Sequence, residues 1–104
     1  MIVVNTDFIP DRKIKETLGL VRGNSVRAKH IGKDIKAAFR GIAGGRVTEY
    51  VEMLTESREE ALNEMVEKAE EMEADAVINV RFMTSSVMGG AAEILAYGTA
   101  VKLE

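Results

Sequence analysis

The only histidine of the 104-residue chain is His30, and Asp34 follows it four residues later. If this stretch is helical, the imidazole and the carboxylate lie on one face, within reach of each other. Imidazole nitrogen is a common ligand of transition metals, so this pair is the first candidate for a metal site. One histidine from each copy of an oligomer could also converge on a symmetry axis. A lone histidine among basic residues is, however, more typical of a solvated loop.

A second candidate site surrounds two adjacent glycines, Gly44 and Gly45, which have Arg40 and Arg46 on either side and Tyr50 shortly after. Arginine side chains near a helix start could bind an anion, because the helix dipole favours negative charge there. A phosphate-binding loop, however, follows a strand and carries a Gly-Lys-Ser/Thr sequence, whereas this pair follows a predicted helix. The sequence therefore favours a helix end and a turn here, and leaves a small-molecule or anion site as the alternative.

Other side chains argue against several kinds of chemistry. The chain has no cysteine, which removes disulfides, thiolate metal sites and thiol nucleophiles. Of its six methionines, only Met83 and Met88 flank a turn as a thioether pair, and we expect the methionines to serve packing. No serine has the context of a nucleophile elbow. The sequence favours a non-catalytic protein, with an enzyme whose site lies between subunits as the less favoured alternative.

Charge is distributed unevenly along the chain. The net charge is −3, but residues 1–46 carry ten basic and four acidic side chains, whereas residues 49–75 carry eleven acidic and two basic ones. Rows of glutamate on a helix usually face water, and they bind hard cations only in favourable cases. An acidic chain without an aromatic platform does not favour nucleic acid as a partner. We expect the basic residues to meet the acidic helix of a neighbouring subunit.

The candidate site residues must be positioned by helices and strands, and the sequence predicts one long helix most strongly. Apolar residues recur at helical spacing over residues 47–74, namely at Val47, Val51, Leu54, Ala61, Leu62, Met65, Ala69 and Met72. Arg58 falls on the same stripe as its only polar member. At 1.5 Å per residue the helix extends roughly 40 Å. A shorter helix is predicted over residues 33–43, before the glycine pair.

Strands are predicted before and after the helices. Residues 1–5 form a short strand, and residues 13–29 form either two short strands or one long bent strand with bulges at Gly19 and Gly23. Residues 74–84 alternate as a strand, which predicts a shared face for its larger apolar side chains, namely Ala76, Ile78, Val80 and Phe82.

The last predicted strand, residues 93–103, is apolar on both faces. Leu95, Tyr97, Val101 and Leu103 lie on one face, and Ile94, Ala96, Gly98 and Ala100 on the other. One helix covers one face of a small sheet, so the second face needs another cover. That cover is either the short helix or another copy of the chain, and the residues favour an oligomer.

Length and segment types indicate one domain over residues 1–104. The first residues do not have the pattern of a signal peptide. No stretch approaches the roughly 20 apolar residues that a membrane span requires. We therefore expect a cytoplasmic protein with no membrane partner.

Several short motifs occur in a characteristic order: Gly19–Gly23, Asp34, Gly44–Gly45, Tyr50, Arg58 with Ala61, Ala74–Val77 and Tyr97–Val101. Together they resemble the YbjQ-like family of small prokaryotic proteins, which carries a general heavy-metal-binding label. The resemblance implies an α+β, two-layer, dodecin-like fold, in which an antiparallel sheet packs on one long helix plus a short helix. It also implies a ring, typically a homopentamer, in which short strands help assembly. A metal ion is then the first ligand to test.

Two residues depart from the family pattern. The family usually has glycine at the position of Glu73, directly after the long helix. A left-handed conformation there would cost a residue with a side chain about 1 kcal/mol, so either the helix ends differently or the strain is tolerated. Ser57 stands where the family often has alanine.

Overall fold

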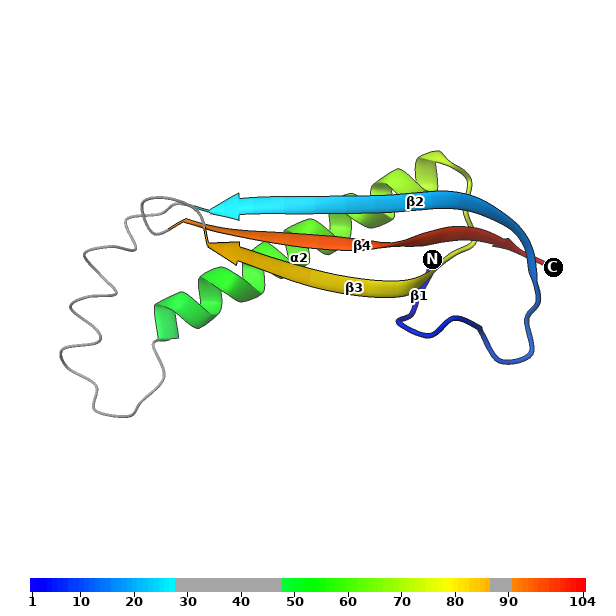
Figure 1. The fold of residues 1–104 in the computed structure, drawn as a ribbon, viewed down its shortest axis with the longest axis horizontal. Coiled ribbons are helices and arrows are strands. Elements are labelled where there is room, and N and C mark those ends of the chain that lie inside the picture. The colour runs from blue at the N-terminus through cyan, green and yellow to red at the C-terminus, as the bar shows by residue number, and fades with distance from the viewer. Residues whose placement is uncertain (28–47, 87–90) are drawn as a thin grey trace.

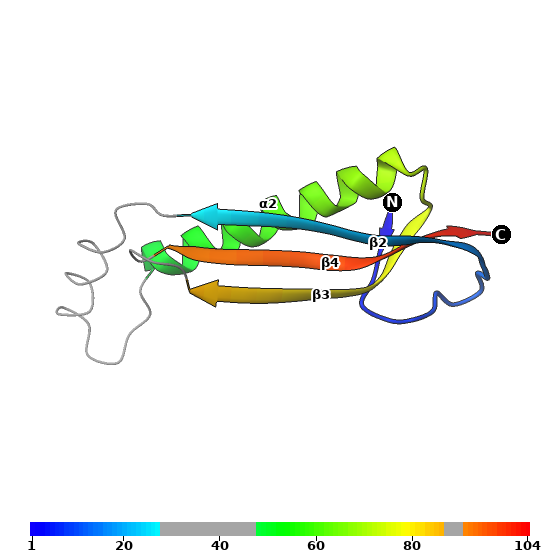
Figure 2. The same ribbon diagram turned by 45° about the horizontal axis from the view of Figure 1, so that its top comes forward.

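The computed structural model describes residues 1–27, 48–86 and 91–104, and the structural statements below concern these residues. They form, in chain order, β1 (Ile2–Val3), β2 (Ile14–Arg27), α2 (Thr48–Glu71), β3 (Ala76–Ser86) and β4 (Ala92–Leu103) (Figure 1). The strands make one sheet in the order β1-β3-β4-β2, and α2 packs across β2 and β4 on one face (Figure 2). The predicted α+β class is confirmed, and the predicted short helix, residues 33–43, lies outside the described residues.

The sheet is mixed rather than purely antiparallel, which corrects the expectation from the sequence. β4 pairs antiparallel with β2 on one side and with β3 on the other. β1 pairs parallel with the first residues of β3, through Ile2 with Ala76 and Val3 with Val77. The parallel pair arises because the chain crosses from β1 to β3 through all the intervening elements, whereas β3 and β4 are neighbours in sequence.

Helix α2 ends in a left-handed turn. Glu73 has a φ of 61°. The backbone N–H of Glu73 donates to the carbonyl oxygen of Glu70 at 2.9 Å, and that of Ala74 donates to the carbonyl oxygen of Ala69 at 3.0 Å. These two bonds define a Schellman motif, whose left-handed position is usually glycine. The helix therefore ends as it would with glycine, and Glu73 bears the strain.

The face of α2 that lies against the sheet differs in part from the predicted stripe. Its fully buried residues recur every four positions, namely Met53, Ser57, Ala61, Met65 and Ala69. Leu54 and Leu62 are only partly buried, beside this line. Arg58 is exposed, so its predicted place on the buried stripe is wrong. The small side chains at positions 57, 61 and 69 let the helix approach the sheet along this line, which turns position 58 toward solvent.

Strand β2 is one continuous strand, which confirms the alternative of one long strand over that of two short strands. Its register with β4 shifts twice, between Ile14 and Glu16 and between Thr17 and Gly19, and Gly19 has a φ of 134°. Gly23, however, is not a bulge, because its register with Ala96 is regular. A Cβ at Gly23 would lie 2.5 Å from the Met65 backbone nitrogen, so this glycine lets strand and helix backbones pack closely.

A bulge in β3 changes which side chains share a face. The register of β3 with β4 shifts between Ile78 and Arg81, and Asn79 has a φ of 54°. Ile78 therefore lies in one hydrophobic cluster and Val80 in another. The prediction that Ala76, Ile78, Val80 and Phe82 share a face is wrong, because the extra residue of the bulge reverses the alternation after Ile78.

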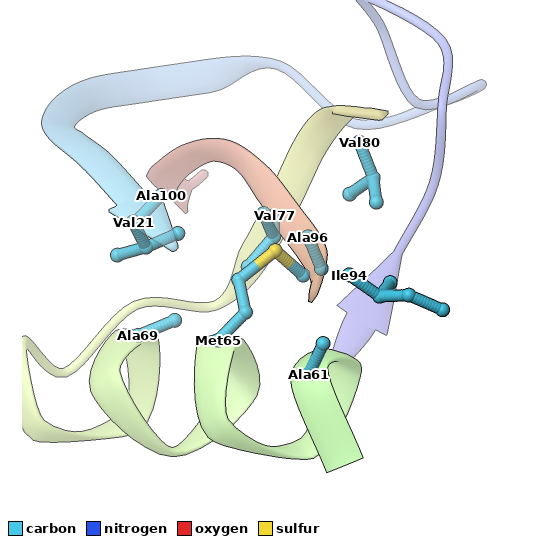
Figure 3. Packing of buried hydrophobic residues seen from close by; sticks show 9 residues of the cluster. All are labelled: Val21, Ala61, Met65, Ala69, Val77, Val80, Ile94, Ala96 and Ala100. Carbon is cyan, nitrogen blue, oxygen red and sulfur yellow. The ribbon is translucent and has the colours of Figure 1, made fainter. Parts of the chain in front are cut away.

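Two hydrophobic clusters lie on opposite faces of the sheet. The larger cluster joins α2 to the sheet, where Met65 points from the helix toward Val77 and Ala96 (Figure 3). The smaller cluster is formed by Ala76, Ile78, Val101 and Leu103, with Ile2, Val4 and Ile9 packed against it. The N-terminal segment thus covers one end of the sheet face opposite α2. The two apolar faces predicted for the last strand are confirmed.

Candidate functional site

The residues predicted to bind ligands are not placed by the structure. The metal candidates His30 and Asp34, and the anion candidates Arg40, Gly44, Gly45 and Arg46, lie outside the described residues. Tyr50 lies in the first turn of α2, and the structure describes its place in the helix but not its side chain. These site residues therefore remain predictions.

A polar cluster joins the end of β2 to the N-terminal half of α2, and we call its members, Ser25, Arg27, Glu56 and Glu60, the β2–α2 polar cluster. The Ser25 hydroxyl donates to Glu60 Oε2 at 2.7 Å. Arg27 Nη1 lies 2.8 Å from Glu56 Oε2, and Arg27 Nη2 pairs with Glu60 Oε1. The Arg27 side chain is 18% exposed, whereas the side chains of Glu56 and Glu60 are 60% and 53% exposed.

Local geometry explains why these residues meet. Glu56 and Glu60 are four apart on one flank of the helix, and Ser25 and Arg27 are two apart on the same face of the strand. Sequence reasoning placed these glutamates on the polar side of the long helix, but it neither joined Glu56 with Glu60 nor paired them with β2. The usable signal was the alternation of Gly23, Ser25 and Arg27 on one face of the strand, where Gly23 and Ser25 are small enough to fit beneath a helix.

The β2–α2 polar cluster is suited to fixing strand against helix rather than to catalysis. The Ser25 hydroxyl points at a carboxylate that also pairs with Arg27, so Glu60 is not free to take the serine proton. Two carboxylates around one guanidinium leave a net charge of about −1, and partly exposed ion pairs of this kind contribute about 0–1 kcal/mol each.

Ser57 is the one buried side chain of the described residues whose polar atom has no hydrogen-bond partner. It is 1% exposed, on the sheet-facing line of α2. An unpartnered buried hydroxyl costs about 1–3 kcal/mol. Alanine at this position would remove that cost.

The sheet face turned away from α2, beyond the end covered by the N-terminal segment, carries exposed apolar side chains; we call it the outer sheet face. Leu20 is 65% exposed, Val26 57% and Met83 53%. Tyr97 lies between Arg22 and Arg81 in the paired strands, and Leu95 between Asn24 and Met83. Paired residues share a face, so this surface mixes apolar groups with two arginines. Nothing among the described residues packs over it.

Metal ligands do not converge in the part of the chain that the structure places. Among residues 1–27, 48–86 and 91–104, no three histidine, cysteine, aspartate or glutamate side chains come together as a metal-binding group. Within the same ranges, no helix has both the length and the apolar character needed to cross a membrane.

Comparison with known proteins places this architecture in a family. A UPF0145 protein of Methanosarcina acetivorans is 61% identical over 103 residues, which cover 99% of this chain and 97% of the relative. A UPF0145 protein of Archaeoglobus fulgidus is 56% identical over 99% of this chain and 95% of its own length. A UPF0145 protein of Thermotoga maritima is 56% identical over 100% of this chain and 98% of its own length.

A solved structure supports the fold. The crystal structure of a DUF74-family protein of unknown function from Pediococcus pentosaceus matches with a TM-score of 0.67, covering 100% of this chain and 98% of that one. At 19% sequence identity, this likeness concerns the fold alone. The YbjQ_1 family model, described as "Putative heavy-metal-binding", matches residues 1–104. The chain therefore belongs to the YbjQ-like, UPF0145 family, as its ordered motifs indicated.

Proposed function

We propose that the protein is a non-catalytic binding protein that assembles with copies of itself and holds its ligand between subunits. The observation that carries this proposal is the outer sheet face. Leu20, Val26 and Met83 are all more than half exposed there, side by side with the half-buried Leu95 and Tyr97. Apolar side chains gathered on one face of a small sheet are typical of an association surface.

Charge supports a head-to-tail arrangement of the copies. Arg22 and Arg81 lie on the outer sheet face with one acid, Glu93, whereas the solvent side of α2 is rich in glutamate. A contact between these two different surfaces is heterologous, and a heterologous contact whose rotation closes makes a ring. We propose such a ring, with the homopentamer and the dodecin-like arrangement of the family resemblance as its specific form.

The ligand proposed first is a metal ion, because the family model carries a heavy-metal-binding description. The alternative is a small molecule or anion bound near Arg40, Gly44, Gly45, Arg46 and Tyr50. The β2–α2 polar cluster supports a non-catalytic role, since its serine and its arginine are both tied to carboxylates. An enzyme with a site between subunits remains the less favoured alternative.

Light scattering coupled to size exclusion tests the assembly. Tyr97→Asp places a charge in the middle of the outer sheet face, and we expect it to dissociate the oligomer while the far-ultraviolet circular dichroism is retained. Phe8→Asp is the matched control, because Phe8 is also exposed but lies in the N-terminal loop rather than on this face. Dissociation by both variants equally, or a monomeric wild type, would contradict the proposal.

A further inference from the structure

We infer that a heavy metal site of this protein takes ligands from more than one copy, because one chain has no cysteine and a single histidine and, among the described residues, no three acidic or histidine side chains converge. The inference rests on the proposed function, since it says where the metal site of the assembly lies. It follows from the donor atoms that the chain offers and from where the structure places them.

The chain has too few soft ligands for a site of its own. Heavy metals bind best to thiolate, imidazole and thioether groups, and protein sites commonly supply three or four of them. The sequence contains no cysteine and one histidine, His30. A soft site within one subunit would therefore need methionine sulfurs as most of its ligands.

The described methionines are not arranged to supply them. Met53 is buried on α2, and Met65 is buried in the contact between α2 and the sheet, where aliphatic groups enclose its side chain (Figure 3). A sulfur packed in this way contributes to the core and has no room for a metal ion.

Of the three exposed methionines among the described residues, Met1, Met72 and Met83, the last two lie far apart. The Met72 methyl group is 3.9 Å from the Cβ position of Gly19, which pairs with Ala100, whereas Met83 pairs with Leu95. Five residues along a strand span about 17 Å, and Met83 lies on the sheet face opposite α2. These two thioethers therefore do not converge on one ion.

The three glutamates that follow one another at four-residue spacing on α2, namely Glu56, Glu60 and Glu64, are each paired with a basic side chain. Glu56 and Glu60 share Arg27, and Glu64 Oε1 lies 3.0 Å from Lys68 Nζ. A cation at the first pair would have to displace a mostly buried guanidinium. Carboxylate oxygen also suits calcium and magnesium better than heavy metals. Among residues 1–27, 48–86 and 91–104, the donor set of one subunit thus does not fit the heavy metal of the family description.

A consequence is that metal binding and assembly are linked. A ligand that binds only between copies stabilises the assembled state by mass action. For one such site, a free metal concentration of about 100 times its dissociation constant strengthens assembly about 100-fold.

The test compares assembled and dissociated protein. Wild type, Tyr97→Asp and Leu95→Asp are loaded separately with Zn²⁺, Cd²⁺ and Cu⁺, desalted, and measured by native mass spectrometry and elemental analysis. Two variants are used so that a folding failure of one, detected by circular dichroism, leaves the other. If neither variant dissociates, the double variant Leu95→Asp/Tyr97→Asp is used in their place. If the wild type is itself monomeric, it is measured directly as the single subunit.

We expect folded single subunits to retain no stoichiometric metal. One ion held by each folded single subunit would overturn the inference. Metal on the assembled wild type that is lost on dissociation supports both the inference and the proposed function. If the assembled wild type binds no metal, the inference is supported but the proposal that the ligand is a metal ion is refuted. If the wild type is monomeric and binds no metal, the inference is supported but the proposed assembly is refuted.

Discussion

Replacing Glu73 with glycine should stabilise the protein, although it removes a side chain. Glu73 occupies the left-handed position of the Schellman motif that ends α2, with a φ of 61°. Its carboxylate forms no hydrogen bond or ion pair among the described residues. Glycine reaches this conformation without steric cost, so Glu73→Gly relieves strain and sacrifices no contact that the structure shows.

The size of the effect follows from three terms. A left-handed conformation costs a residue with a side chain about 1–2 kcal/mol. Glycine also makes the unfolded chain more flexible, which stabilises the unfolded state and reduces this gain by about 0.4–1 kcal/mol. Removing a negative charge near the helix C-terminus adds about 0.3 kcal/mol. We expect a net gain of about 1 kcal/mol, within a range of about 0.3–1.9 kcal/mol, and 1 kcal/mol corresponds to a rise in Tm of about 5 °C for a chain of this length.

Urea unfolding at one fixed subunit concentration measures this gain. Two controls separate the terms. Glu73→Gln removes only the charge and should stabilise by about 0.3 kcal/mol. Glu70→Gly places glycine at an exposed helical position of the same helix and should destabilise by about 0.5–1 kcal/mol. A neutral or destabilising Glu73→Gly would refute the assignment of strain to this residue.

Two further substitutions test the contact between α2 and the sheet. Gly23→Ala should destabilise by about 3 kcal/mol or more, because the new Cβ meets helix backbone atoms that cannot move separately; Asn24→Ala, whose side chain points to the other face, should change the unfolding free energy by less than about 0.5 kcal/mol. Equal effects of these two in urea unfolding would contradict the close backbone approach. Ser57→Ala should stabilise by about 1 kcal/mol, because it removes a buried hydroxyl without a partner among the described residues. A lower midpoint in the same assay would show that the hydroxyl has a partner.

The sequence predicted those elements whose periodicity continues without interruption. The spacing of three and four over residues 47–74 identified α2, and two-sided apolarity identified β4 as a strand that needs a cover on both faces. Both signals depend only on which side chains must leave water. The predicted second cover was the short helix or another copy, and the sequence did not indicate that the N-terminal segment covers one end of that face.

The errors have local physical causes. The bulge at Asn79 inserts a residue into β3, and a pattern of alternating residues gives no sign of a left-handed asparagine. The assignment of Arg58 to the buried stripe failed because positions 57 and 58 both fit helical spacing, and only the close fit of small residues at Gly23 and Ala61 decides between them. The candidate site near His30 and Gly44 was inferred from residue types alone, and it stays a prediction.

The most direct test of self-assembly is native mass spectrometry of the untagged protein over a series of decreasing concentrations. We predict one closed multiple of the 11.4 kDa subunit that persists on dilution, because none of the described residues covers the outer sheet face and we propose that another copy does. A single folded subunit at every concentration would contradict the account.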